Sequence, residues 1–156
     1  MERSVRLDTP VGPVTVTATE RAVTAVRFGA AGPAVGQAGD LPPVLRQAVE
    51  ELREYFAGER REFTLPLAPA GTPFQQQVWA ALREIPYGAT CSYRRIAERI
   101  GRPKACRAVG MANNRNPIAI VVPCHRVVGA SGALVGYAAG LEVKEKLLAL
   151  ESMNNE

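Results

Sequence analysis

The period of the hydrophobic pattern changes at one proline- and glycine-rich segment, and this change limits the possible folds more than any other feature of the chain. The segment "LPLAPAGTP", residues 65–73, has the composition of a linker. Before it, short apolar runs with a period of two, typical of strands, occupy residues 5–7, 14–19 and 23–28. One amphipathic helical pattern follows over residues 44–56. This part of the chain therefore predicts a small sheet with one helix.

After the segment the pattern has the period of helices. Thr72 can cap a helix that begins at Pro73, and Ser92 can cap another that stops at Gly101. Pro103 favours the start of a further helix after a turn of only two residues. Two short helices joined by a tight turn with a glycine are typical of a helix-turn-helix, although such pairs also occur in proteins that never bind DNA.

Together these patterns predict a mixed α/β protein of two domains. We expect an N-terminal α/β domain over residues 1–66, a linker over residues 67–72 and a mostly helical C-terminal domain over residues 73–156. The longest apolar run, residues 118–122, is far shorter than the ~20 residues of a membrane-spanning helix. Because the N-terminus is also charged where a signal peptide is apolar, we expect a cytoplasmic protein that does not enter membranes.

The cysteines do not form a pattern of their own. Cys91, Cys106 and Cys124 are odd in number, contain no C-x-x-C pair and share the chain with a single histidine. This predicts reduced cysteines, no disulfide framework and no metal site. No sequence feature indicates a cofactor.

Basic residues are concentrated in the second half. Residues 83–126 contain nine Lys and Arg against two Asp and Glu, a net charge of +7, whereas residues 1–70 have a net charge of −1. A basic segment within a folded domain favours a polyanionic partner, with a solvated surface as the alternative. Combined with the helix-turn-helix pattern, it predicts nucleic-acid binding.

One motif places a thiol beside the only histidine. The motif "VVPCHRVVG" ends an apolar run with Pro123, Cys124, His125 and Arg126. Because proline interrupts a sheet ladder and charged groups are costly to bury, we expect a strand end that opens into a cleft. A thiolate there is a nucleophile whose proton a histidine could accept. A lone cysteine is otherwise commonly a small buried hydrophobic residue.

The residues alone do not decide how Cys124 and His125 interact or which carboxylate orients the histidine. Neighbours on an extended chain point to opposite faces, so Cys124 and His125 interact only if the chain turns after Pro123 or a water molecule bridges them. A carboxylate that orients the histidine would come from the C-terminal helix, which offers Glu142, Glu145 and Glu151. A cysteine hydrolase is one function with these parts.

About half of the chain closely resembles the O6-alkylguanine-DNA alkyltransferases, or methylated-DNA–protein-cysteine methyltransferases. The resemblance is carried by "GTPFQQQVWAALREIPYGATCSYRRIAERIGRPKACRAVGMANNRNP" and "NPIAIVVPCHRVVGASGALVGYAAGLEVKEKLLALE", in which P-C-H-R-V is very specific. The N-terminal half is similar only in outline, including "TPVGPVTV". The family implies a ribonuclease H-like first domain and a winged-helix-like second domain.

The resemblance also implies a role for each catalytic position. Cys124 would accept the alkyl group, and His125, oriented by Glu151, would act as the base through a water molecule. Asn116 would tie the helix-turn-helix to the cysteine strand, and Tyr93 would donate from its hydroxyl to the guanine O6.

The same resemblance implies residues for DNA and for the base. Arg107 would fill the place of the extruded nucleotide, and Gln75, Arg94 and Arg102 match positions near the DNA backbone together with Tyr93. The pocket for the base would be lined by Val127, Tyr137 and Ala138, where Ala138 replaces a serine of some relatives.

The implied function is DNA repair by direct reversal. The protein would transfer the alkyl group irreversibly and once from O6-alkylguanine in duplex DNA, with O4-alkylthymine as a further candidate substrate. Its partner would be double-stranded DNA, bound as a monomer or cooperatively. The alternative is a non-catalytic protein that binds alkylated DNA.

Overall fold

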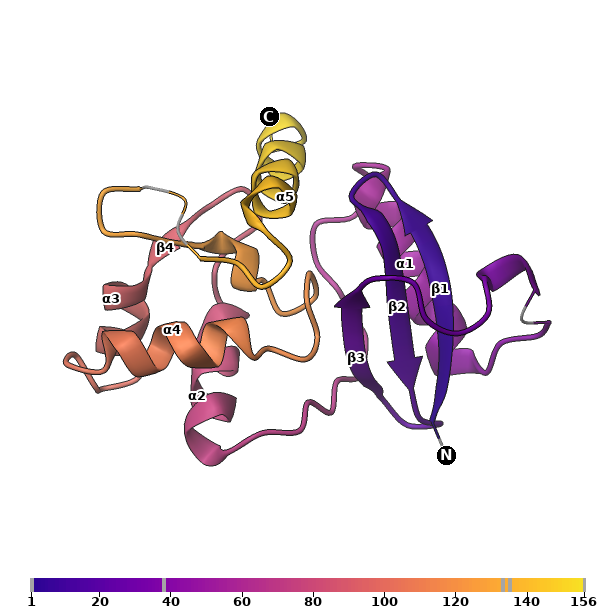
Figure 1. The fold of residues 1–156 in the computed structure, drawn as a ribbon, viewed down its shortest axis with the longest axis horizontal. Coiled ribbons are helices and arrows are strands. Elements are labelled where there is room, and N and C mark those ends of the chain that lie inside the picture. Colours follow the sequence, from indigo (N-terminus) through magenta and orange to yellow (C-terminus); the bar gives the residue numbers. More distant parts are fainter. Residues whose placement is uncertain (1, 38, 133, 135, 156) are drawn as a thin grey trace. The chain divides into compact units, whose positions relative to one another are not determined.

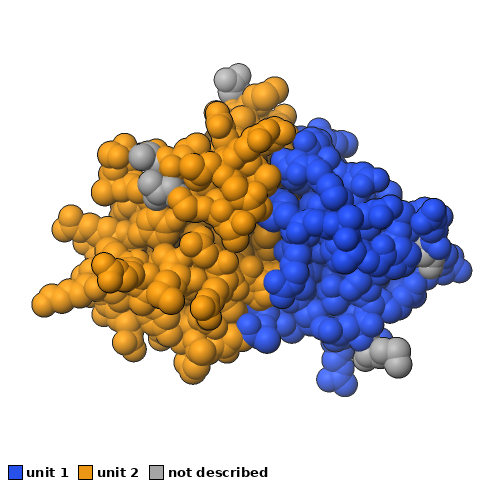
Figure 2. Space-filling view, viewed as in Figure 1, with its two compact units in different colours: residues 1–70 blue, residues 71–156 orange. Residues whose placement is uncertain are grey.

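The computed structural model describes residues 2–37, 39–132, 134 and 136–155. The chain divides into two compact units, Met1–Ala70 and Gly71–Glu156 (Figure 2). The division lies inside the segment that we expected to be a linker. No helix of the described residues combines the length and the apolar character needed to cross a membrane.

Unit 1 is a three-stranded antiparallel sheet with one helix against it (Figure 1). Its elements are β1 (Arg3–Thr9), β2 (Gly12–Ala18), β3 (Val23–Phe28), the short 3₁₀ helix η1 (Val35–Gln37) and α1 (Pro43–Phe56). The register places Val16 opposite both Val5 and Val26, so a row of buried valines crosses the sheet. The helix α1 buries Leu45 and Leu52 in the same core. The predicted sheet and helix are confirmed.

Unit 2 is mostly helical and contains one two-stranded sheet. Its elements are α2 (Pro73–Leu82), β4 (Cys91–Ser92), α3 (Tyr93–Arg99), α4 (Cys106–Asn114), the 3₁₀ helix η2 (Cys124–Arg126), β5 (Val127–Val128) and α5 (Leu141–Met153). Thr72 caps α2 and Ser92 caps α3, as predicted. The indole N–H of Trp79 donates to the carbonyl of Ala112 at 2.9 Å, which links α2 to α4 within the core.

Two sequence expectations about unit 2 are wrong. The helix after Gly101 begins at Cys106 and not at Pro103, because the Ala105 N–H donates to the Arg102 carbonyl and closes a separate turn first. The apolar residues 118–122 form a buried turn and not a strand. Periodicity alone does not separate these two forms, since a short apolar run is typical of any buried segment.

Candidate active site

The backbone before Cys124 is folded into a compact turn by Asn116. Its side-chain nitrogen donates to the carbonyls of Ile118 at 3.3 Å and Val122 at 2.8 Å, and its oxygen accepts from the Ile118 N–H at 3.0 Å. Within this turn, Ile120 has a φ of +72°, which β-branched residues rarely adopt. The side chain of Asn116 therefore holds together the segment that leads to the cysteine.

Cys124 itself begins η2, so the chain turns sharply after Pro123. This is one of the two arrangements that the sequence left open for Cys124 and His125. After η2, Val127 in β5 pairs in parallel with Cys91 in β4. Tyr93 follows β4. Burial raises its pKa, and the charge of the Cys124 thiolate adds to this rise, since the ladder brings the two residues near each other.

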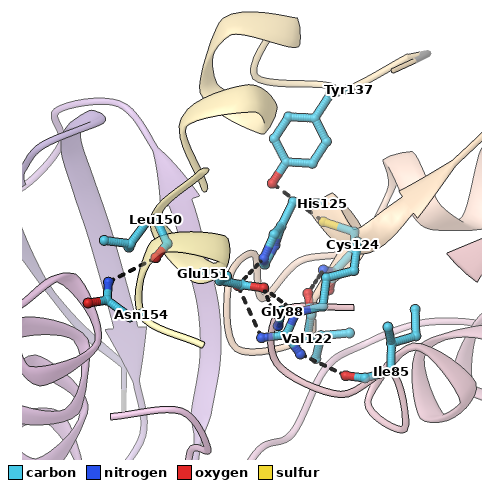
Figure 3. A network of polar contacts seen from close by, with 11 residues as sticks. Ile85, Gly88, Val122, Cys124, His125, Tyr137, Leu150, Glu151 and Asn154 are labelled. Atoms are coloured by element: carbon cyan, nitrogen blue, oxygen red, sulfur yellow. Dashed lines mark hydrogen bonds and ion pairs between the residues drawn. The ribbon is translucent and has the colours of Figure 1, made fainter. Parts of the chain in front are cut away.

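The thiol of Cys124 is 5% exposed and lies among polar groups. Its Sγ–H donates to the hydroxyl of Tyr137 across 3.7 Å, with the tyrosine ring extending away from the sulfur (Figure 3). Burial raises the pKa of Cys124, and hydrogen bonds from Asn116 and Tyr137 together with the charge of Lys144 oppose this rise only in part. The sulfur is therefore a thiol at neutral pH and requires a base.

A buried network beside the thiol links η2 to the last turns of α5 (Figure 3). Nε2 of His125 lies 2.6 Å from Oε2 of Glu151, and both side chains are fully buried. Arg126 donates to both carboxylate oxygens, from Nε at 2.8 Å and from Nη2 at 3.1 Å. Its Nη1 donates to the Ile85 carbonyl at 2.7 Å, and the Gly88 N–H donates to Glu151 at 3.4 Å. Glu142 and Glu145, the other carboxylate candidates, are exposed.

The charges of this network determine its protonation. Burial alone would raise the pKa of Glu151, but hydrogen bonds and charge from His125 and Arg126 outweigh it and lower the pKa to about 2. Burial lowers the pKa of His125, against the effect of Glu151 and with that of Arg126 and Lys144. At neutral pH the imidazole is therefore neutral, with its Nε2–H donated to Glu151.

This tautomer leaves Nδ1 of His125 as an acceptor. Among the described residues, Nδ1 has no hydrogen-bond partner although it is completely buried. A buried acceptor on the residue after the thiol is where a bridging water would bind and carry a proton from Cys124. The arrangement therefore combines a buried thiol with a buried nitrogen acceptor on the next residue.

Lys144 is a member of the site that the sequence interpretation missed. It is buried, donates from Nζ to the Gly136 carbonyl at 3.5 Å and lies 5.9 Å from the centre of the Tyr137 ring. Burial lowers its pKa, and the thiolate of Cys124 opposes this. Lys144 precedes Glu151 by two helical turns, so helical spacing could have placed it on the same face.

The residues expected to contact DNA lie on the helix-turn-helix and on α2. Arg107 is exposed near the start of α4, Arg94 is exposed on α3, and Arg102 is exposed in the turn between them. The ring of Tyr93 lies beneath Gly110 of α4, where an added Cβ would be 3.7 Å from it. Gln75 completes the capping box of α2 with Thr72, a structural role not foreseen for it.

The remaining pocket residues differ in burial. Val127 is fully buried in β5, Tyr137 is half-buried over the thiol, and Ala138 is exposed. The structure therefore brings together Cys124, His125, Glu151, Asn116, Tyr93 and Tyr137, while Ala138 has no described contact with them.

Comparison with known proteins identifies the family. The model of the 6-O-methylguanine DNA methyltransferase DNA binding domain matches residues 73–153, and that of the ribonuclease-like domain of the same enzymes matches residues 6–69. A methylated-DNA–protein-cysteine methyltransferase of Methanosarcina acetivorans is 50% identical over 151 residues, covering 92% of this chain and 94% of the relative. One from Mycobacterium leprae is 50% identical over 147 residues, covering 93% and 89%.

Solved structures agree with this result. The Mycobacterium tuberculosis O6-methylguanine methyltransferase has a TM-score of 0.86 at 45% identity, covering 99% of this chain and 94% of that one. A second M. tuberculosis structure, determined in complex with DNA, has a TM-score of 0.87 at 46% identity, covering 97% and 93%. The chain therefore belongs to the family of methylated-DNA–protein-cysteine methyltransferases.

Proposed function

We propose that this protein repairs DNA by moving an alkyl group from O6 of guanine in duplex DNA to Cys124. The observation that carries the proposal is the polar cluster of Cys124, His125 and Glu151 in a unit that matches the DNA-binding domain of the methyltransferase family. The cluster supplies a nucleophile, an acceptor for its proton and a carboxylate that fixes the acceptor.

Access of the lesion to the thiol requires extrusion of the base. An alkyl group on O6 lies within the duplex, and unstacking a nucleotide costs a few kcal/mol, less for a lesion that pairs badly. Arg107, exposed on α4, would fill the gap, while Arg94, Arg102 and Gln75 would bind the backbone. Because the hydroxyl of Tyr137 lies 3.7 Å from the sulfur, a purine that reaches the thiol would contact this side chain.

The transfer proceeds by attack of sulfur on the alkyl carbon. The thiol proton passes through water to Nδ1 of His125, the C–S bond forms, and the electron pair of the C–O6 bond stays with guanine. Tyr93 keeps its proton because burial raises its pKa, so it can donate a hydrogen bond to O6 as negative charge develops there. Val127 and Tyr137 would enclose the base, and Ala138 could contribute only its backbone.

The product is a thioether, which has no carbonyl for water to attack. No group of the proposed site can remove the alkyl group, so each molecule reacts once. O4-alkylthymine presents a similar alkyl–oxygen bond and is a second candidate substrate. Neither the ionisation of Cys124 nor the transfer of the alkyl group needs a cofactor or a metal ion.

Comparison of Cys124→Ala with the wild type separates transfer from mere binding. We expect the variant to bind DNA containing O6-methylguanine with near wild-type affinity and to leave the lesion intact, whereas the wild type restores guanine. Cys91→Ala, at a half-buried position outside the cluster, should behave as the wild type. A wild type that binds the lesion without restoring guanine would instead be a lesion-binding protein.

A further inference from the structure

We propose that Arg126 is a positioning residue that neutralises Glu151 and thereby keeps the imidazole of His125 unprotonated until Cys124 supplies a proton. The inference deepens the proposed function and rests on it. No described contact joins Arg126 to the thiol. It acts on His125 through the carboxylate that the two residues share and through its own positive charge.

Arg126 holds the carboxylate of Glu151 by two hydrogen bonds, whereas His125 holds it by one. Oε1 of Glu151 accepts from Nε of Arg126, and Oε2 accepts from both Nη2 of Arg126 and Nε2 of His125. The two arginine bonds form the fork that matches a carboxylate most closely. His125 therefore makes one hydrogen bond to the carboxylate of Glu151, and the positive charge of Arg126 already balances the negative charge of that carboxylate.

The remaining guanidinium nitrogen of Arg126, Nη1, binds the segment that follows α2. Nη1 donates to the carbonyl of Ile85, in the segment after α2, and the guanidinium carbon lies 5.7 Å from the centre of the Tyr87 ring. The guanidinium is therefore bound to the segment after α2 as well as to the carboxylate of α5. This anchoring gives it a fixed position relative to His125.

The charged and titratable groups around His125 come from two elements. Helix α5 contributes Glu151 and Lys144, and η2 contributes Arg126 and Cys124. The third element packed against η2, helix α2, contains no titratable side chain. Glu151 is thus the only described anion that favours an imidazolium here, and Arg126 is the cation bonded directly to it.

Loss of this cation would change the resting state of the base. Glu151 would then be balanced by His125 alone, and a buried carboxylate that lacks another cation favours a protonated imidazole. An imidazolium cannot accept the proton of Cys124. The site would need a higher pH to lose that proton before the thiol could ionise.

The single histidine of the chain makes the proposal directly measurable. We would follow the imidazole ¹⁵N and ¹H signals against pH by NMR in the wild type, Arg126→Gln, Arg126→Lys and Arg83→Gln. Arg83 is exposed, so its variant is a control with the same charge change. We expect the wild type and the control to show a neutral Nε2–H tautomer at pH 7. Arg126→Gln should titrate about one pH unit or more higher, and Arg126→Lys should titrate between the two.

The rate of alkyl transfer should follow the titration. In Arg126→Gln we expect about a tenfold loss at pH 7, which falls to little or none at pH 9 once the imidazole is neutral. An equal loss at every pH with an unchanged histidine titration would mean that Arg126 is only structural. If Arg126→Gln does not fold, an imidazolium in the wild type at pH 7 would overturn the proposal by itself. The NMR titration does not depend on alkyl transfer, so failure of the proposed function would be seen separately.

Discussion

Nε2 of His125 lies 2.6 Å from Oε2 of Glu151, and the two residues are 26 positions apart in the chain. The pair ties η2, which holds the thiol, to the C-terminal end of α5. A base made this way exists only when α5 is packed in place. The integrity of the last helix and the reactivity of Cys124 should therefore change together.

Replacement of Glu151 by glutamine should weaken both properties. The amide keeps the shape of the carboxylate but leaves the buried guanidinium of Arg126 without its counter-charge, which costs about 3 kcal/mol of unfolding free energy. The single-turnover transfer rate should fall about 100-fold, because His125 loses the anion that stabilises its protonated form. Urea denaturation and quenched-flow kinetics measure the two effects. Glu145→Gln, exposed on the same helix, should change neither, and a folded Glu151→Gln protein with an unchanged rate would exclude this role.

Acid should destabilise the protein through the same carboxylate. The pKa of Glu151 falls from 4.5 to about 2 on folding, so its contribution is fully present above about pH 5 and is lost as the pH falls towards 2. The contribution is at most about 3 kcal/mol. His125, whose pKa burial lowers, acts in the same direction below about pH 6.5. Melting temperatures between pH 7 and pH 3 should fall more steeply for the wild type than for Glu151→Gln. Parallel curves would contradict this.

Removal of the Tyr137 hydroxyl should make the thiol less acidic. Once Cys124 is ionised, its sulfur can accept a hydrogen bond from the Tyr137 hydroxyl, and this bond lowers the pKa of the thiol. Tyr137→Phe removes the hydroxyl and keeps the ring, so the thiolate fraction at a given pH falls. The rate of modification by iodoacetamide should decrease several-fold at pH 8 and recover at higher pH. A faster reaction would show that the ring controls access to the sulfur and that its hydroxyl does not control ionisation.

The hydroxyl of Tyr93 should matter for the leaving group and not for the thiol. Tyr93→Phe keeps the ring packed beneath Gly110, so stability should change by less than about 0.5 kcal/mol. Transfer from O6-methylguanine in DNA should slow by about tenfold or more, while iodoacetamide modification of Cys124 stays near the wild-type rate. Equal slowing of both reactions would place the role of Tyr93 at the sulfur.

The sequence predicts the sheet of unit 1 well because apolar residues recur at every second position of its strands and these residues are buried. Val14 and Val16 of β2 are buried, and period two is visible in their spacing. The caps at Thr72 and Ser92 are equally local, since each side chain bonds the backbone three residues on. Features of this kind depend on neighbours in the chain.

The turn before Cys124 could not be predicted in the same way. Val121 and Val122 are as apolar as a buried strand, and only the three bonds of the Asn116 side chain show that the segment folds back. The start of α4 at Cys106 likewise depends on a local turn that competes with the helix-favouring proline.

The partners of the candidate site are a matter of packing over long sequence distances. Spacing on α5 left Glu142, Glu145 and Glu151 as equal candidates, and only the resemblance to the family chose among them. The burial of Lys144 and the hydrogen bond from Arg126 to Ile85 both depend on the packing of elements far apart in the chain. No local sequence pattern predicts such packing.

The central claim is that the alkyl group leaves DNA and stays on Cys124, and intact-mass analysis with peptide mapping tests it most directly. After incubation with excess duplex DNA containing O6-methylguanine, every protein molecule should carry one methyl group, located on Cys124, with guanine restored in equal amount. An unmodified protein, a methyl group on Cys91 or Cys106, or repair beyond one lesion per molecule would contradict the account.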